Sequence, residues 1–188
     1  MLGRKSLTAA ALAVSCGWSV LGVPQARAET AAPAAAPAAA PAGPEEGAPI
    51  ARLQIQRIGL KTEVREGVGE AVLRRAVGHY PGTALPGRNG NTALFGHRTT
   101  WHRPFYKLDR IRRGDRIVLR AGTTSYVYKA SGKRVIEPDD KRVLEPVPFE
   151  WGSTPDGEYI TLITCTPKGS DRYRLVVVGK LHQKKRIR

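Results

Sequence analysis

The sequence predicts an all-β domain whose short strands form a barrel or a sandwich. From Ile50 onward, short runs of alternating apolar and polar residues are separated by turns rich in glycine, proline and asparagine. These runs follow one another about every eight to twelve residues, a spacing typical of barrels and sandwiches. Few stretches have helical periodicity and no internal repeat is present, so we expect helices to be minor.

The expected strands follow from this alternation. In the first of them, Leu53 and Ile55 alternate with Gln54 and Gln56. The other expected strands are residues 92–96, 116–120, 125–130, 134–136, 159–164 and 174–181. Turn signals between these runs, such as Gly-Asp at 114–115, support the boundaries.

Two helical segments and one long loop are expected between the strands. A short helix is predicted from the i, i+3, i+4, i+7 spacing of Leu73, Ala76, Val77 and Tyr80. Residues 105–111 are expected to hold a further helical turn. Residues 78–90 contain two Pro-Gly pairs and one Asn-Gly pair, which predict a surface loop. Ordered loops on a β scaffold commonly carry binding groups.

The first 49 residues are expected to lie outside the folded domain. Residues 1–28 have a basic start, an uncharged stretch and a small-x-small cleavage site, so they are interpreted as an export signal. The uncharged stretch is just long enough to span a bilayer, and a retained signal anchor is therefore the alternative. Residues 29–49, in which prolines recur among alanines, predict an extended linker.

The charge balance is strongly basic. The chain has 31 Lys and Arg against 16 Asp and Glu, a formal net charge of +15, and a basic tail is expected at residues 184–188. Export and the lack of a basic motif interleaved with aromatics argue against a nucleic-acid partner. An exported basic domain is expected to meet an anionic membrane or wall polymer, and the alternative is a solvated surface without a partner.

Cys165 is the only cysteine outside the N-terminal apolar stretch. An unpaired thiol in an exported domain cannot form an internal disulfide. Most free cysteines are small buried hydrophobes. Cys165, however, ends an apolar, β-branched run that Pro167 and Gly169 stop, so it lies at a strand end, near loops and solvent. This position favours a thiol nucleophile.

A cysteine nucleophile needs a base or a cation nearby. Of the four histidines, His97 also lies where a strand opens into a loop, and we prefer it over the others on position alone. Residues 159–165 and 174–181 predict an antiparallel hairpin that places Arg174 opposite Cys165. An arginine there would stabilise an oxyanion, with Arg172 as its competitor and an ordinary strand-end charge as the alternative.

Three sequence motifs stand out around these residues: Thr161-Leu162-Ile163-Thr164-Cys165, Gly96-His97-Arg98 and Arg174-Leu175-Val176-Val177. Together they resemble the sortases, the cysteine transpeptidases of the bacterial cell surface, and they occur in that family's order. The resemblance runs from about Ile50 to Leu181, and the catalytic domain is expected to span residues 50–183. Gly78-His79-Tyr80-Pro81-Gly82-Thr83 and Gly96-His97-Arg98-Thr99-Thr100 are most similar to class E, with class D next.

This resemblance implies a closed eight-stranded β-barrel with short helices. It implies that Cys165 attacks the Thr-Gly bond of an LAXTG or LPXTG sorting signal, that His97 transfers the protons and that Arg174 stabilises the oxyanion. Thr164 and Tyr80 are implied substrate-binding residues, and Tyr80 would favour alanine in the signal. Tyr80 could instead be a packing residue of the predicted helix.

The resemblance further implies that an amine of a peptidoglycan precursor resolves the acyl-enzyme at the extracellular face of the membrane or in the wall. No metal and no cofactor are expected. Two alternatives stay open: a pilin-polymerising sortase, which joins the acyl group to a lysine, and a non-catalytic exported module that binds anionic wall polymer.

Overall fold

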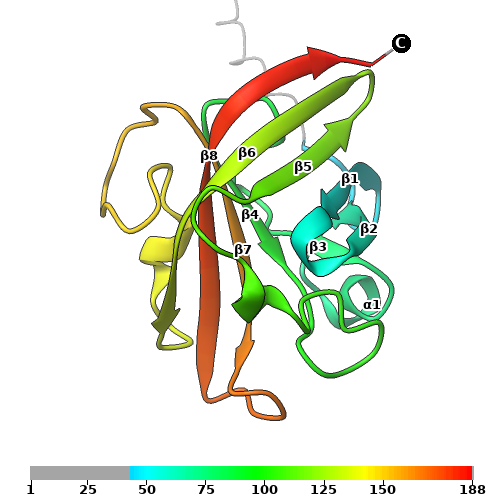
Figure 1. Ribbon diagram of the computed structural model, residues 1–188, viewed down its shortest axis with the longest axis vertical. Coiled ribbons are helices and arrows are strands. Elements are labelled where there is room, and N and C mark those ends of the chain that lie inside the picture. Colours follow the sequence, from blue (N-terminus) through cyan, green and yellow to red (C-terminus); the bar gives the residue numbers. More distant parts are fainter. Residues whose placement is uncertain (1–42, 188) are drawn as a thin grey trace, which may run out of the picture. The chain divides into compact units, whose positions relative to one another are not determined.

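The computed structural model describes residues 43–187 of the chain, so the predicted export signal and most of the predicted linker lie outside the described residues. Eight strands dominate the fold, with one short α-helix and three short 3-10 helices (Figure 1). The strands are β1 (Pro49–Ile55), β2 (Leu60–Glu66), β3 (Val77–His79), β4 (Gly90–Phe95), β5 (Arg116–Ala121), β6 (Thr124–Ile136), β7 (Glu158–Thr166) and β8 (Tyr173–Arg186). The helical elements are η1 (Gln56–Ile58), α1 (Glu70–Leu73), η2 (Leu108–Arg110) and η3 (Lys141–Leu144).

The strands close into a barrel in the order β1-β2-β3-β4-β7-β8-β6-β5. Most neighbours pair antiparallel, whereas β2 with β3 and β4 with β7 pair parallel. The predicted fold class, an all-β closed barrel of eight strands with short helices, is confirmed. In Figure 1, β7 (orange) and β8 (red) run side by side as the predicted hairpin.

Side chains alternate across each strand, and one set fills the barrel. Along β7 and β8, Leu162, Leu175 and Val177 belong to the main core together with Leu94 of β4. These side chains are almost fully buried, and burial of apolar area is the largest favourable contribution to folding. The opposite faces of the same three strands point out of the barrel.

A second apolar cluster covers this outer face. Ala93, Ile163 and Val176 pack there against Val143 and other residues of the segment that connects β6 to β7. Asn91 anchors this segment, because its side-chain amide donates to the carbonyl oxygen of Val143 at 2.9 Å. The β6–β7 segment therefore covers one side of the outer face of β4, β7 and β8.

The predicted helix through residues 73–80 is wrong beyond its first residue. α1 ends at Leu73, and Val77 begins β3, which pairs with both β2 and β4. A Cβ atom at Gly78 would lie 2.3 Å from the carbonyl oxygen of Gly67, so this position suits a glycine in a close strand pair. Gly78 and His79 are consequently buried in β3, and only the rest of residues 78–90 forms the predicted loop.

Three predicted boundaries also change. β6 is a single strand of 13 residues, because a register shift between Ala130 and Gly132 carries it through the apparent turn. β8 continues to Arg186 by pairing with the start of β6, so the predicted basic tail is largely a strand. β1 begins at Pro49, inside the predicted linker. The predicted turn at residues 105–111 is confirmed as η2. No helix within residues 43–187 is long and apolar enough to cross a membrane.

Candidate active site

Cys165 lies near the end of β7 on the outer face of the barrel. It shares this face with Ile163, whereas Leu162 and Thr164 point to the opposite side, as the two-residue period of a strand requires. Ile163 is buried, but Cys165, one step nearer the strand end, is only half-buried and its thiol is free. The predicted position of Cys165 at an accessible strand end is confirmed.

Arg174 is directly opposite Cys165 in the β7–β8 hairpin, as predicted. The same residue pairs with Ile136 at the end of β6, so Arg174 lies between the nucleophile strand and the β6–β7 segment. Its guanidinium donates from Nη1 to the carbonyl oxygen of Asp171 at 2.6 Å and more weakly to that of Tyr173. The remaining donors of a half-buried guanidinium are available to a ligand.

Arg172 occupies a different environment. It lies in the exposed connection before β8, where its guanidinium stacks 5.1 Å from the ring centre of Tyr173. Hairpin register therefore distinguishes the two arginines, because it places only Arg174 beside Cys165.

His97 reaches the same end of the barrel from β4. The parallel register pairs Phe95 with Ile163, and the amide of Gly96 continues the ladder by donating to the carbonyl oxygen of Ile163 at 3.1 Å. His97 and Cys165 each lie two residues beyond this pair, so both follow on the outer face of neighbouring strands. The structure thus brings Cys165, His97 and Arg174 to one edge of the β4–β7–β8 surface.

The imidazole of His97 has an unsatisfied nitrogen. Its Nε2 atom is buried and has no hydrogen-bond partner among the described residues. Burial lowers the pKa of His97 below its ordinary value of about 6.5, because the charged form loses hydration, and the negative charge of Glu70 on α1 partly offsets this shift. No internal hydrogen bond therefore has to break before this nitrogen can take or give a proton.

Two hydrogen bonds hold the ends of β4 and β7 together. Thr164 is buried, and its hydroxyl donates to the carbonyl oxygen of Gly96 at 2.7 Å. That hydroxyl is used within the protein, although Thr164 was expected to contact a substrate. Arg98 donates from Nη1 to the carbonyl oxygen of Cys165 at 3.4 Å, so the residues on both sides of His97 are bonded to β7.

Arg98 is a site residue to which sequence reasoning gave no role. It is 5% exposed and also donates to a carboxylate oxygen of Asp109 at 3.0 Å and to the carbonyl oxygen of Tyr106 at 3.2 Å. The guanidinium thereby joins the β4–β5 connection to β7. The position of Arg98 next to His97 could have indicated a role in the site. Its bond to Cys165, 67 positions away, could not be predicted from the sequence.

Tyr80 lies on the outer face, in the second apolar cluster. Its ring centre is 5.6 Å from that of Phe95, at an interplanar angle of 37°. It does not extend a helix with Leu73 and Val77, because Val77 is in β3. Since Phe95 precedes Gly96-His97, Tyr80 is close to the β4 edge of the site.

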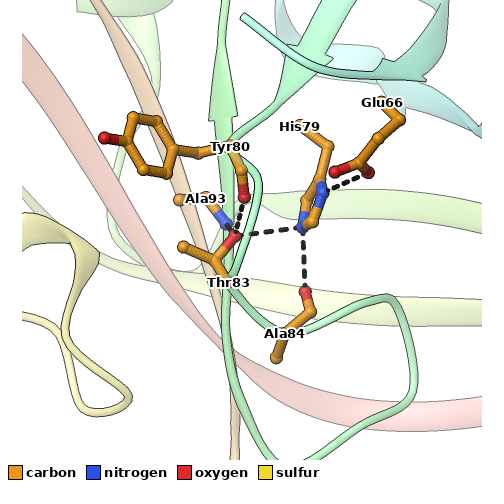
Figure 2. Close-up of polar contacts among 6 residues, drawn as sticks. All are labelled: Glu66, His79, Tyr80, Thr83, Ala84 and Ala93. Carbon is orange, nitrogen blue, oxygen red and sulfur yellow. Dashed lines mark hydrogen bonds and ion pairs between the residues drawn. The ribbon is translucent and has the colours of Figure 1, made fainter. Parts of the chain in front are cut away.

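The other three histidines have different surroundings. His102 and His182 are exposed. His79 is buried in β3, and Figure 2 shows its ring between Glu66 of β2 and the loop residues Thr83 and Ala84. The preference for His97 agrees with these placements. Across residues 43–187, no cluster of three or more His, Cys, Asp or Glu side chains could hold a metal ion.

Known proteins resemble this chain in sequence. The family model of the sortase domain matches residues 53–182. Sortase SrtE1 of Streptomyces coelicolor is 39% identical over 145 residues, which are 73% of this chain and 41% of the relative. Sortase D of Bacillus subtilis is 26% identical over 140 residues, 73% of this chain and 66% of that protein.

Solved structures agree. Sortase E from Streptomyces avermitilis has 38% sequence identity and a TM-score of 0.68, and the match covers 76% of this chain and 93% of that one. The matched part of this chain spans about two fifths of the length of the two Streptomyces coelicolor relatives, 41% and 39%. Because the sortase domain accounts for more than half of the sequence, and because fold and relatives agree with it, the chain belongs to the sortase family.

Proposed function

We propose that this protein is a cell-surface cysteine transpeptidase that cleaves a C-terminal sorting signal of the LAXTG or LPXTG type between Thr and Gly. It would then transfer the shortened protein to a peptidoglycan amine. The strand register that lines up Cys165 with Arg174 on β8 and with His97, just after the end of β4, carries this proposal. One acyl group can thus meet a nucleophile, a proton carrier and an oxyanion donor at a single strand edge.

Cys165 is the proposed nucleophile. Its sulfur, as the thiolate, adds to the carbonyl carbon of the Thr-Gly bond and forms a tetrahedral oxyanion. When that intermediate collapses, the C–N bond breaks and a thioester joins the threonine to Cys165. Half-burial suits this role, because the sulfur is accessible to a peptide yet lies on a rigid strand.

His97 is the proposed proton carrier. In the first half-reaction the imidazolium gives its proton to the departing glycine amine. In the second half-reaction the neutral imidazole takes a proton from the incoming amine, which attacks the thioester and releases the thiolate. The unpartnered Nε2 supports this role, since it has no competing contact within the described structure.

Arg174 is the proposed oxyanion donor. Its fixed charge is directly opposite Cys165, and its planar fork offers several directed N–H groups. Thr164 and Arg98 are proposed to act indirectly. They hold the His97 segment against β7 and leave the substrate surface to other residues.

The β6–β7 segment supplies a surface for the sorting signal. A groove of about 400 Å³ opens between the end of β6 and η3, and Ile136, Phe149 and Tyr173 are among its lining residues. Ile136 pairs with Arg174 and Tyr173 precedes it, so the groove leads to the candidate oxyanion donor. A solved sortase E1 of Streptomyces coelicolor is described with a tripeptide in its active site.

Tyr80 is the proposed selectivity residue. Its ring packs on Phe95 at the β4 edge, and its hydroxyl could bond a peptide N–H that proline lacks. We predict faster cleavage of an LAXTG peptide than of the matched LPXTG peptide, and loss of this preference in Tyr80→Phe. Side-by-side kcat/KM values test this, and a clear preference for the proline peptide would contradict it.

The proposed setting is the extracellular face of the membrane or the wall, with an anionic membrane or wall polymer as the contact of the basic surface. The chain's formal net charge of +15 supports such a contact. A pilin-polymerising activity differs only in its acceptor, a lysine side chain of another subunit.

Mass spectrometry tests the reaction. The chain is incubated with an LAXTG peptide and either a small amine that represents the peptidoglycan acceptor or a lysine-bearing pilin peptide. We expect a thioester adduct on Cys165 and a product joined to the small amine. Transfer only to the lysine peptide would favour pilin polymerisation. A second test treats the folded protein with a thiol-directed reagent. If Cys165 reacts only after the protein unfolds, the result would favour the non-catalytic binding module.

A further inference from the structure

A buried polar network lies directly behind the proposed selectivity residue. His79 and Glu66 are only 1% and 6% exposed, and they face each other in the parallel register of β2 and β3. Their side chains meet with Nδ1 2.7 Å from Oε2, as Figure 2 shows. The sequence offered no role for either residue, and the proposed mechanism uses neither.

The hydrogen-bond partners of His79 fix where its hydrogens lie. Nε2 is 3.2 Å from the carbonyl oxygen of Ala84, which can only accept, so Nε2 carries a hydrogen. Nδ1 faces Glu66, and a carboxylate also only accepts. Both ring nitrogens of His79 are therefore engaged by the protein.

Thr83 connects this pair to Tyr80. The Thr83 hydroxyl donates to the carbonyl oxygen of Tyr80 at 2.7 Å, so its oxygen is left to accept from Nε2 of His79 at 3.0 Å. The amide of Ala93 also donates to that oxygen, at 3.4 Å. Figure 2 shows that these contacts converge on the turn from Tyr80 to Ala84.

The network and the Tyr80 ring lie on opposite faces of the sheet. His79 pairs with Leu94, a core residue of the barrel, whereas the amide of Tyr80 donates to the carbonyl oxygen of Ala93, whose side chain is in the outer cluster. Successive side chains alternate, so the His79 ring points inward and the Tyr80 ring outward. Because the two residues are adjacent, a fixed His79 ring also restrains the direction of the Tyr80 side chain.

We propose that the Glu66–His79–Thr83 network is a positioning device, which holds the turn after β3 so that Tyr80 is presented at the β4 edge of the active site. The inference rests on the proposed function, because Tyr80 is a substrate contact only there. It adds three residues that touch no substrate and act through Tyr80. Tyr80 lies on the loop, and the buried contacts of Glu66, His79 and Thr83 restrain that loop.

Thr83→Val tests this proposal with little change of shape. The variant keeps the β-branched volume but removes the oxygen that joins His79 to the Tyr80 carbonyl. Thr83→Ser keeps that oxygen, and Thr123→Val is a matched control at an exposed position between β5 and β6. All variants are made in the full chain, and their melting temperatures show that they fold.

The first measurement does not depend on activity. Proton NMR detects contacts between the rings of Tyr80 and Phe95. We expect these contacts to weaken or disappear in Thr83→Val and to persist in Thr83→Ser and Thr123→Val. Unchanged ring contacts in Thr83→Val would overturn the proposal, whether or not the chain cleaves sorting peptides.

The second measurement is cleavage of an LAXTG peptide. Since a hydrogen bond of this kind contributes modestly, KM should rise roughly 3–10-fold in Thr83→Val with little change in kcat. Tyr80→Ala in the Thr83→Val background should add little, because both changes remove the same presentation of Tyr80. Fully additive effects of the two changes would overturn the coupling. If the unchanged chain cleaves no sorting peptide, the proposed function fails, and the NMR result still decides the positioning role.

Discussion

Two histidines at neighbouring strands of this barrel, His79 and His97, differ in how far the protein satisfies their ring nitrogens. His79 is buried in β3, with one ring nitrogen bonded to a carboxylate and the other to a carbonyl and a hydroxyl. His97 follows β4 and is half-buried, and its Nε2 has no partner within residues 43–187. Every polar atom of the first ring is used by the protein, whereas the buried Nε2 of the second ring has no partner within residues 43–187.

This contrast shows what separates a structural histidine from a candidate catalyst. Both residues lie at strand ends near glycines, and the amino-acid type is the same. The difference is whether the fold already satisfies the ring, since an engaged nitrogen must break a bond before it can move a proton. Removing each ring should therefore damage a different property.

The largest effect is expected from the reacting residues themselves. Cys165→Ala removes the nucleophile and should abolish peptide cleavage, and His97→Ala should lower kcat by roughly 10²–10⁴. Both side chains are half-buried on the outer face, so circular dichroism and melting temperature should stay close to those of the unchanged chain. More than a few per cent of activity in Cys165→Ala would end its assignment as the nucleophile.

The opposite result is expected at the inner histidine. Glu66→Ala leaves the buried Nδ1 of His79 without its partner and should lower the free energy of unfolding by about 1–3 kcal/mol. Glu66→Gln should cost less, because its amide can donate to Nδ1 of a neutral ring while Nε2 keeps its hydrogen for Ala84. Urea denaturation of both variants measures this, and equal losses would show that the glutamine amide does not replace the bond between the Glu66 carboxylate and His79.

Two arginines extend the comparison. Arg98 is buried with three partners, whereas Arg174 is half-buried beside Cys165 and uses only Nη1 within the protein. Arg174→Lys keeps the charge but loses the fork, and loss of one oxyanion donor typically costs about 10²–10³ in rate. Arg172→Lys should change kcat/KM only slightly. The reverse order would move the oxyanion role to Arg172.

Local patterns predicted most of the barrel and the site edge. Alternation and turn residues identified most of the strands, and the hairpin turn was enough to place Arg174 opposite Cys165. The same patterns failed at residues 73–80. The helical spacing of four apolar residues there did not form a helix, because β3 pairs with both β2 and β4. They also divided β6, because a bulge at residues 130–132 has the composition of a turn.

The supporting contacts could not be predicted, because they join residues distant in sequence. Arg98 meets the carbonyl of Cys165 across 67 positions, and Thr164 meets Gly96 across 68. His79 and Glu66 are only 13 positions apart, yet their contact depends on a parallel pairing that needs the whole barrel. A single sequence shows which groups can bond but not which of them the fold satisfies.

The smallest expected effect concerns the charge near the open histidine. Glu70 raises the pKa of His97 against the larger lowering by burial, so Glu70→Gln should lower that pKa further. The change should be small, because Glu70 is exposed and bonded to Arg74 at 2.9 Å. A proton NMR titration of His97 in the Cys165→Ala background should give a midpoint below about 6.5 before the change and a lower one after it. Glu63→Gln, which removes a similar arginine-paired carboxylate on β2, is the control and should leave the midpoint unchanged. A higher midpoint in Glu70→Gln would mean that Glu70 does not stabilise the imidazolium of His97. The protonation of His97 needed for the first half-reaction would then have to come from another group, such as one brought in with the substrate.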